Sequence, residues 1–88
     1  MHFEWDSEKS AANEEKHGAD FWFACELWND RVVTFPSRRN GENRKLSIGR
    51  IAGEYWTVIW EDRNETRRII SARRATPKER SLYDRNDG

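Results

Sequence analysis

The sequence predicts an α+β fold: a small antiparallel sheet, two N-terminal helices packed on one of its faces, and a short C-terminal helix. Two observations lead to this prediction. Helix-capping residues followed by helix formers occur at positions 6–29 and again after position 75. Between them, positions 32–74 carry β-branched and aromatic residues in short runs separated by turn residues. At 88 residues, the chain is expected to form one domain over positions 1–88.

The N-terminal part of the chain predicts a strand followed by two helices. Residues 2–5 alternate polar and apolar side chains, as a short strand does. Asp6 is suited to cap a helix that Gly18 ends, and this helix has so few apolar residues that it must lie at the surface. Asp20 can cap a second helix over residues 21–29. Its apolar stripe consists of Phe21, Ala24, Cys25 and Trp28.

The predicted sheet is built mainly from the second half of the chain. Its strands are expected at residues 32–35, 44–50, 55–60 and 67–73, with a basic loop over residues 37–43. The strand at 55–60 is apolar on both faces and should therefore be central. After the last strand, Thr76, Pro77 and Glu79 form the capping signature that starts the C-terminal helix.

Charge is distributed unevenly along a chain whose formal net charge is zero. Residues 1–30 hold two basic and eight acidic side chains, whereas residues 31–88 hold fourteen basic and eight acidic ones. Twelve of those fourteen are arginines, whose planar guanidinium can bind a phosphate through two hydrogen bonds. This asymmetry indicates a portion that faces nucleic acid, although an evenly solvated surface would show the same composition.

Few other kinds of site are compatible with the sequence. Cys25 is the one cysteine, so an intramolecular disulfide is excluded, and with His2 and His17 it makes no metal-binding motif. The sequence contains no phosphate-binding glycine loop and no nucleophile motif. It also contains no apolar run long enough to cross a membrane and no signal peptide. We therefore expect a cytoplasmic protein without membrane association, cofactor or metal.

The arginines of residues 66–75 are the main candidates for binding phosphate. In a regularly alternating strand, Arg67 and Arg73 lie on one face and Arg68 and Arg74 on the other. If the helices cover one face, the other presents two arginines at a spacing that can span adjacent phosphates. Alternatively, the arginines only extend from the strand ends into solvent, with their stems packed on apolar residues.

Side chains that can move a proton are scarce. Lys16 and His17 end the first predicted helix, where a basic residue also interacts favourably with the helix dipole. Glu4 can serve as a base or as an ion-pair partner. Tyr83, in the last helix, carries a phenol that can reach a phosphate or pack against the sheet. The residues alone leave these alternatives open.

Motifs near both ends of the chain resemble those of a known family. They are Phe3-Glu4-Trp5-Asp6, Lys9, Asn13, Lys16-His17-Gly18 and Phe21, then RIISARRA at 68–75, Glu79-Arg80 and Tyr83. In this order and spacing they resemble the BrnT family of bacterial type II toxins. The resemblance implies a RelE-like ribonuclease toxin, held inactive by a BrnA-type antitoxin that carries a ribbon-helix-helix domain. Promoter DNA would then be contacted only through the antitoxin.

One departure from the family concerns the end of the central strand. The family commonly ends this strand with a Thr-Glu-Arg-like sequence, whereas residues 60–63 are Trp-Glu-Asp-Arg here. Arg63 fits the pattern and Trp60 does not. We therefore keep Arg63 among the candidate site residues.

The resemblance and the available side chains together imply RNA cleavage without a metal ion. Cleavage needs a group that takes the 2′-hydroxyl proton, donors for the charge that develops on the phosphate, and an acid for the leaving oxygen. We assign catalysis to Lys16, His17, Arg63, Arg73 and Tyr83, and phosphate binding to Arg67, Arg68, Arg74 and Arg80. The antitoxin is expected to cover this surface. The alternative is a nucleic-acid-binding or protein-interaction module that uses the same arginines without catalysis.

Overall fold

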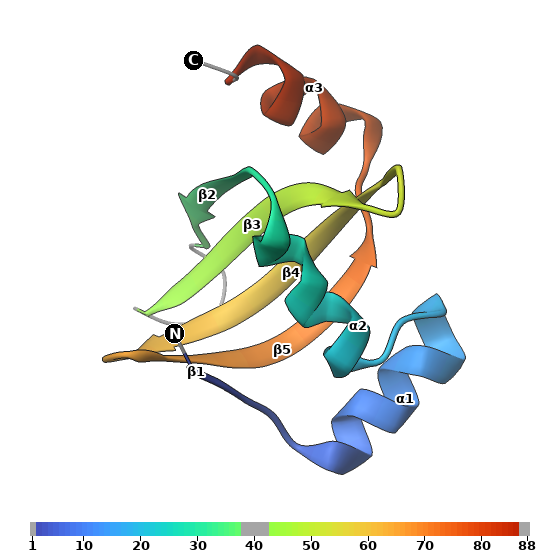
Figure 1. Cartoon of the computed structure of the whole chain (residues 1–88), viewed down its shortest axis with the longest axis vertical. Coiled ribbons are helices and arrows are strands. Elements are labelled where there is room, and N and C mark those ends of the chain that lie inside the picture. Colours follow the sequence, from blue (N-terminus) through green and yellow to red (C-terminus); the bar gives the residue numbers. More distant parts are fainter. Residues whose placement is uncertain (1, 38–42, 87–88) are drawn as a thin grey trace.

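The computed structural model describes residues 2–37 and 43–86, so most of the predicted basic loop, residues 38–42, lies outside the described residues. The elements are β1 (His2–Glu4), α1 (Ser7–His17), α2 (Phe21–Cys25), the 3₁₀ helix η1 (Glu26–Asn29), β2 (Val32–Pro36), β3 (Arg44–Ile51), β4 (Glu54–Arg63), β5 (Thr66–Arg74) and α3 (Pro77–Arg85). Figure 1 shows a twisted sheet with α2 in front, α1 at the lower right and α3 at the top. The predicted α+β class is confirmed. Among the described residues, no helix combines the length and apolar character that crossing a membrane requires.

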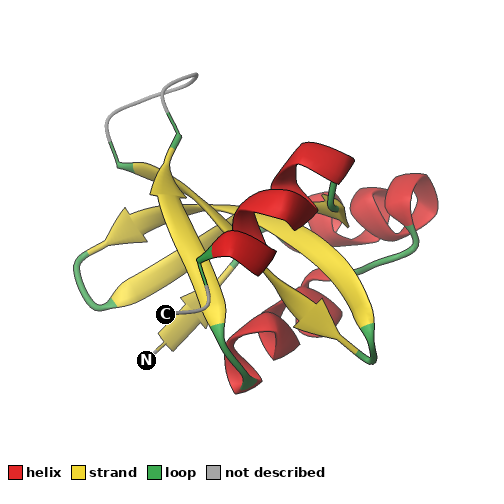
Figure 2. Cartoon of the chain, turned by 90° about the horizontal axis from the view of Figure 1, so that it is seen from above, coloured by secondary structure: helices red, strands yellow, loops and turns green. Residues whose placement is uncertain are grey.

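The five strands form one mixed sheet in the order β1-β5-β4-β3-β2. Strands β2 to β5 pair antiparallel as predicted, but β1 runs parallel to β5, with Phe3 opposite Arg67. The prediction of a purely antiparallel sheet is therefore wrong. Because nearly the whole chain lies between β1 and β5, no hairpin constrains their direction, and a parallel pair is allowed. As predicted, β4 is central, and Figure 2 looks down on the twisted strands from the α3 end.

Strand β5 contains a β-bulge that interrupts its alternation. Two consecutive residues of β4, Ile59 and Trp60, pair with Ser71 and Ile69, so Ile70 is an extra residue in β5. Every side chain after the bulge consequently points to the face opposite to the one that regular alternation assigns to it.

The bulge changes which arginines share a face. Arg68 and Arg73 lie on one face of the sheet, and Arg67 and Arg74 lie on the other. The predicted pairs, which assumed regular alternation, are therefore wrong. The bulge brings Ala72 to the buried side, where it pairs with Val58 in the core.

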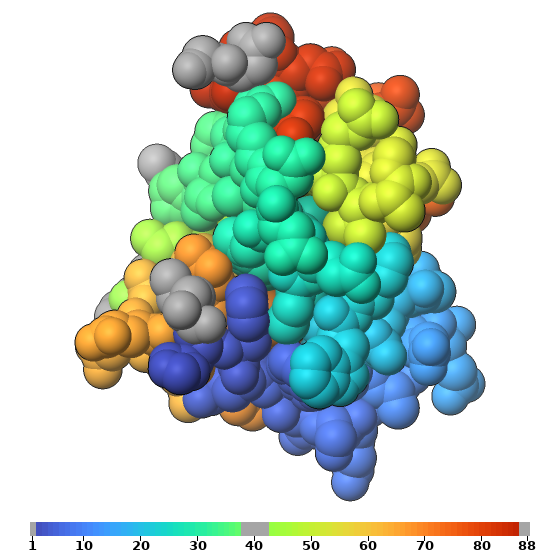
Figure 3. All heavy atoms as spheres, viewed as in Figure 1, coloured from blue at the N-terminus to red at the C-terminus, as the bar shows by residue number. Residues whose placement is uncertain are grey.

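Helices α2 and η1 cover one face of the sheet, which we name the helix-covered face, and their atoms lie across it in Figure 3. The core beneath them includes Phe21, Ala24, Leu27, Trp56, Val58, Trp60, Ile69 and Ala72. The single helix predicted for residues 21–29 instead tightens into 3₁₀ geometry after Cys25. The tighter turn buries Leu27, which packs so closely on Gly49 that a Cβ there would lie 3.0 Å from the leucine side chain.

Helix α1 lies along the edge of β5, beyond the end of β1, and not on the sheet face. Asn13 takes the place of a neighbouring strand there. Its side chain donates to the Ala72 carbonyl at 2.8 Å and accepts from the Ala72 N–H at 3.3 Å. Ser10 ties α1 to α2 by accepting a hydrogen bond from the Phe21 N–H. A helix with few apolar residues is thus attached through hydrogen bonds, and the prediction that both N-terminal helices pack on one face does not hold for α1.

Helix α3 covers one end of the opposite face. The Thr76 hydroxyl accepts from the Glu79 N–H and the Glu79 carboxylate accepts from the Thr76 N–H, so the predicted capping box is present. Tyr83 is buried, with its ring centre 5.7 Å from that of Tyr55 and 3.9 Å from the Arg31 guanidinium carbon.

Candidate functional site

The face of the sheet opposite α2 carries the candidate site. We name it the arginine face. Its basic residues from β3, β4 and β5 are Arg44, Arg50, Arg63, Arg68 and Arg73. Helix α3 packs over the β3–β4 end of this face, and the arginines toward the other end are partly exposed. The described residues enclose no pocket. A ligand would therefore bind here on an open surface.

Two glutamates hold three arginines at the end of this face near β1, and we name these five residues the glutamate cluster. Glu4 accepts a hydrogen bond from Arg68 at 2.9 Å and lies 3.6 Å from the Arg63 guanidinium. Glu61 accepts from the Nε of Arg63 and lies 4.0 Å from Arg44. The hydrogen bond from Arg63 lowers the pKa of the Glu61 carboxyl, so Glu61 stays ionised at neutral pH.

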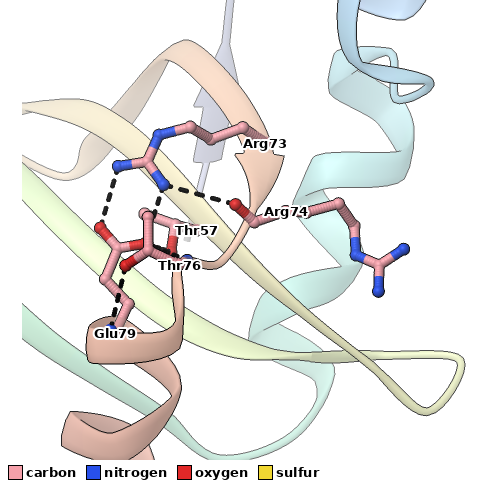
Figure 4. Close-up of polar contacts among 5 residues, drawn as sticks. All are labelled: Thr57, Arg73, Arg74, Thr76 and Glu79. Atoms are coloured by element: carbon pink, nitrogen blue, oxygen red, sulfur yellow. Dashed lines mark hydrogen bonds and ion pairs between the residues drawn. The ribbon is translucent and has the colours of Figure 1, made fainter.

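Arg73 is held by a third glutamate at the α3 end of the face (Figure 4), an arrangement that we name the Arg73 clasp. Its guanidinium donates to both oxygens of Glu79, at 2.8 and 2.9 Å. Glu79 also accepts from the Thr57 hydroxyl and from the Thr76 N–H, each at 2.9 Å. Burial alone would raise the pKa of the Glu79 carboxyl, but these hydrogen bonds lower it to about 2. The partner of Arg73 is therefore ionised at any physiological pH.

Arg67 points to the helix-covered face, into a group of aromatic rings. Its guanidinium carbon lies 4.8 Å from the ring centre of Trp28, 5.1 Å from that of Trp60 and 5.8 Å from that of Phe3. Burial lowers the pKa of the Arg67 guanidinium, and its Nε has no hydrogen-bond partner among the described residues. Arg67 is thus held by cation–π contacts and packing.

Arg74 and Arg80 lie outside the arginine face as defined. Arg74 points away from the Arg73 clasp in Figure 4, pairs with Glu54 at 2.7 Å and lies 5.6 Å from the ring centre of Trp56. Arg80, in the first half of α3, lies 5.2 Å from the ring centre of Tyr55. Both arginine side chains belong to exposed residues and can meet a ligand from solvent.

Among the described residues, none of the three predicted proton-transfer side chains is hydrogen-bonded to these arginines. Lys16 is exposed and His17 is half-buried in the last turn of α1, one turn beyond Asn13 and so at the edge of β5. The Tyr83 hydroxyl is 3.3 Å from the Arg31 carbonyl, to which it donates, on a side chain that is almost fully buried. The structure thus gathers Arg44, Arg63 and Arg68 at one end of the arginine face and Arg73 at the other, and it joins none of the proton-transfer candidates to them by a hydrogen bond within the described residues.

Glu4 is an ion-pair partner, one of the two roles that its sequence position allowed, whereas sequence reasoning did not assign Glu61 and Glu79 to the site. Glu61 stands two residues before Arg63 on one strand, so strand alternation could have paired them. Glu4 meets Arg68 because β1 is parallel to β5 in that register, which no local signal reveals. Glu79 is recognisable as a capping residue, but its bonds to β5 depend on how α3 turns back onto the sheet.

Potential metal ligands are not grouped in this part of the chain. Within residues 2–37 and 43–86, no three His, Cys, Asp or Glu side chains lie close enough together to hold a metal ion. Burial raises the pKa of the Cys25 thiol to about 11, so this side chain stays protonated. Cys25 therefore acts as a small, partly buried apolar residue.

Comparison with known proteins gives a family match over most of the chain. The family model described as "Ribonuclease toxin, BrnT, of type II toxin-antitoxin system" matches residues 5–79. The matched range runs from the residue after β1 to the first turn of α3, and it contains all five of these basic residues of the arginine face. No curated protein matches the chain.

Proposed function

The chain belongs to the BrnT family of ribonuclease toxins of type II toxin–antitoxin systems, and from this premise we propose that it cleaves RNA on the arginine face without a metal ion. Family membership implies an RNA substrate and an antitoxin partner. The observation that supports this location is the convergence of Arg63, Arg68 and Arg73 on one open face of the sheet.

Phosphate groups would replace glutamates as partners of these arginines. In the glutamate cluster three arginines share two carboxylates, so the cluster retains one positive charge. A phosphate presents oxygens to a guanidinium much as a carboxylate does, so Arg63 and Arg68 need little reorientation to bind it. The same donors would stabilise the additional negative charge of the transition state. Arg73 would contribute in the same way from the clasp.

We assign proton transfer to side chains at the margins of the face. His17 and Lys16 end α1 at the edge of β5, and an imidazole can take or give a proton near neutral pH. Tyr83 is a third candidate, but its hydroxyl would first have to leave the Arg31 carbonyl. Arg74 and Arg80 would bind phosphates beyond the face, whereas we expect Arg67 to support the site through packing.

The partner and the setting are also part of the proposal. We propose a RelE-like fold and a cytoplasmic complex with a BrnA-type antitoxin that carries a ribbon-helix-helix domain and contacts promoter DNA. Because the arginine face is open and basic, an antitoxin segment with acidic side chains would neutralise the toxin most simply by covering it. A complex in which this face stays open to solvent would contradict this part of the proposal.

Incubation of the purified protein with RNA in the presence of a chelator tests the proposal. We expect fragments that end in a 2′,3′-cyclic phosphate, because the 2′-hydroxyl attacks the neighbouring phosphorus. Arg68→Gln should abolish the fragments. The matched control is Arg85→Gln, an exposed arginine that donates to the Ser81 carbonyl within α3, and it should cleave like the wild type. Cleavage that stops in chelator and returns with Mg²⁺ would contradict metal independence.

A non-catalytic RNA-binding module is the second candidate. It is favoured by the side-chain hydrogen bonds of the described residues, none of which joins Lys16, His17 or Tyr83 to the glutamate cluster or the Arg73 clasp. Such a protein would bind RNA through the same arginines and release no fragments. A mobility shift of intact RNA, with no cleavage under any condition, would support this candidate and overturn the first.

A further inference from the structure

A second pair of arginines lies at the α3 end of the sheet. Arg50 from β3 and Arg80 from α3 have their guanidinium carbons 5.1 and 5.2 Å from the centre of the Tyr55 ring. Tyr55 on β4 is the register partner of Arg50. Three elements thus place two cations on one aromatic ring, and we name this group the Tyr55 site.

The two arginines of the Tyr55 site differ from those of the glutamate cluster and the Arg73 clasp in having no glutamate partner. Five arginines lie within 4.0 Å of a glutamate: Arg44, Arg63, Arg68, Arg73 and Arg74. Within the described residues, neither Arg50 nor Arg80 makes such an ion pair. Arg50 donates to the Gly53 carbonyl at 3.0 Å, which orients its side chain without offsetting the charge. The nearest carboxylate known at the site is Asp84, which accepts from the Tyr55 hydroxyl at 3.0 Å.

This arrangement is suited to an anion. The two distances to the ring centre place the guanidinium carbons within about 10 Å of each other, which is roughly one Debye length at ~0.1 M salt, so their repulsion is only partly screened. The face of the aromatic ring attracts each cation but carries no net charge. Both arginines belong to exposed residues, so their long side chains can turn toward one phosphate, whose several oxygens accept from both guanidinium groups and offset their repulsion.

The Tyr55 site also continues the arginine face. Tyr55 and Thr57 are alternate residues of β4 and point to the same side, about 7 Å apart along the strand. Thr57 donates to Glu79, which directly precedes Arg80. The site therefore adjoins the Arg73 clasp, on the side away from the glutamate cluster. An RNA strand bound at the glutamate cluster can extend past the clasp to this site.

We propose that Arg50 and Arg80 bind one backbone phosphate of single-stranded RNA, next to the segment that is cut. The inference rests on the proposed function and extends it to Arg50, which no motif in the sequence singles out. The role is binding and positioning, because neither side chain contacts the glutamate cluster or the clasp. The phosphate enters without displacing a glutamate, so this site contributes to the first capture of the strand.

The double variant Arg50→Gln/Arg80→Gln tests the inference. Its binding to a cleavage-resistant 2′-O-methyl RNA oligonucleotide is measured by fluorescence anisotropy over a series of salt concentrations. Loss of one phosphate contact on a single strand flattens the slope of log K against log salt by about 0.7. We expect that change, together with a KM for RNA cleavage that rises about tenfold at nearly unchanged kcat.

Controls separate this inference from the proposed function. Arg85→Gln removes an arginine from the same helix and should keep the wild-type slope. Melting curves check that the variants are folded, and the single variants Arg50→Gln and Arg80→Gln provide a milder pair for the same measurement. An unchanged slope overturns the inference, even if affinity falls. A wild-type protein that neither binds nor cuts RNA overturns the proposed function as well.

Discussion

Arginines leave β5 toward both faces of the sheet, and the two faces bind them differently. On the helix-covered face Arg67 lies among three aromatic rings, and Arg74 lies over a fourth. On the arginine face Arg68 and Arg73 are held by carboxylates. Aromatic rings fix a guanidinium while excluding water, whereas a carboxylate can be exchanged for a phosphate. Arg67 therefore belongs to the fold, whereas Arg68 and Arg73, and also Arg74 through its pair with Glu54, hold carboxylates that RNA can replace.

The largest effect is expected when an arginine is removed from the arginine face. Arg68→Ala deletes a donor that the glutamate cluster holds in place, and loss of one such donor typically slows an enzyme by about 10²-fold. Arg63→Ala and Arg73→Ala should act in the same direction. Initial rates of RNA cleavage measure this, with Arg67→Met as the control from the other face of β5. A folded Arg68→Ala variant that cleaves RNA at the wild-type rate would contradict the different roles of the arginine face and the helix-covered face.

The next effect concerns stability and the helix-covered face. Arg67→Ala removes contacts to Phe3, Trp28 and Trp60, and we expect the free energy of unfolding to fall by about 2 kcal/mol. For a domain of this size that corresponds to a decrease in Tm of about 10 °C. Urea or thermal unfolding measures it. Arg63→Ala, an exposed control, should change stability by less than about 0.5 kcal/mol. If Arg67→Ala and Arg63→Ala were equally stable, the helix-covered face would not hold its arginine more firmly than the arginine face does.

An effect of similar size is expected from acid on the Arg73 clasp. The pKa of Glu79 is about 2 in the folded protein and near 4.5 ordinarily, so its contribution is complete above pH 4.5 and is lost as pH falls toward 2. We expect about 2 kcal/mol, less than the full shift would give, because solvent screens the partly exposed Arg73. Urea unfolding between pH 2 and pH 7 should show this loss in the wild type and not in Glu79→Gln. Parallel pH profiles would contradict the role of the clasp.

The smallest effect is expected from Tyr83→Phe. The variant keeps the edge-to-face contact of the ring with Tyr55 and loses only the hydrogen bond to the Arg31 carbonyl, which costs about 1 kcal/mol. Cleavage by the folded variant should stay close to the wild-type rate. Removal of a general acid or base would instead cost about 10²–10⁴-fold. A loss of that size would identify Tyr83 as the general acid or base and place the proton-transfer site under α3.

Helices and strands that are determined by residues close together in the chain could be predicted from the sequence. Asp6 caps α1 by accepting from two N–H groups of its first turn, and Gly18 ends the helix with φ 78°. The apolar character of both faces of β4 placed that strand at the centre of the sheet. In each case the chemistry that decides the structure is contained within a few positions.

Features that depend on distant partners could not be predicted. The sequence around Ile70 is compatible with a regular strand, and the bulge follows from how Ile69 and Ala72 fit against β4. The sequence identified the arginines but not the face of the sheet to which each one points. A single extra residue in β5 reverses the direction of the side chains that follow it. The glutamates that hold them come from β1, β4 and α3, whose meeting is a property of the complete fold.

The different roles of the two faces can be measured directly by NMR of the arginine side chains. The Nε–Hε resonances report on each guanidinium while a cleavage-resistant 2′-O-methyl RNA is added. The account predicts chemical-shift changes at Arg63, Arg68 and Arg73, as phosphates replace their glutamates, and none at Arg67. Changes at Arg67 with none at the other three arginines would contradict it.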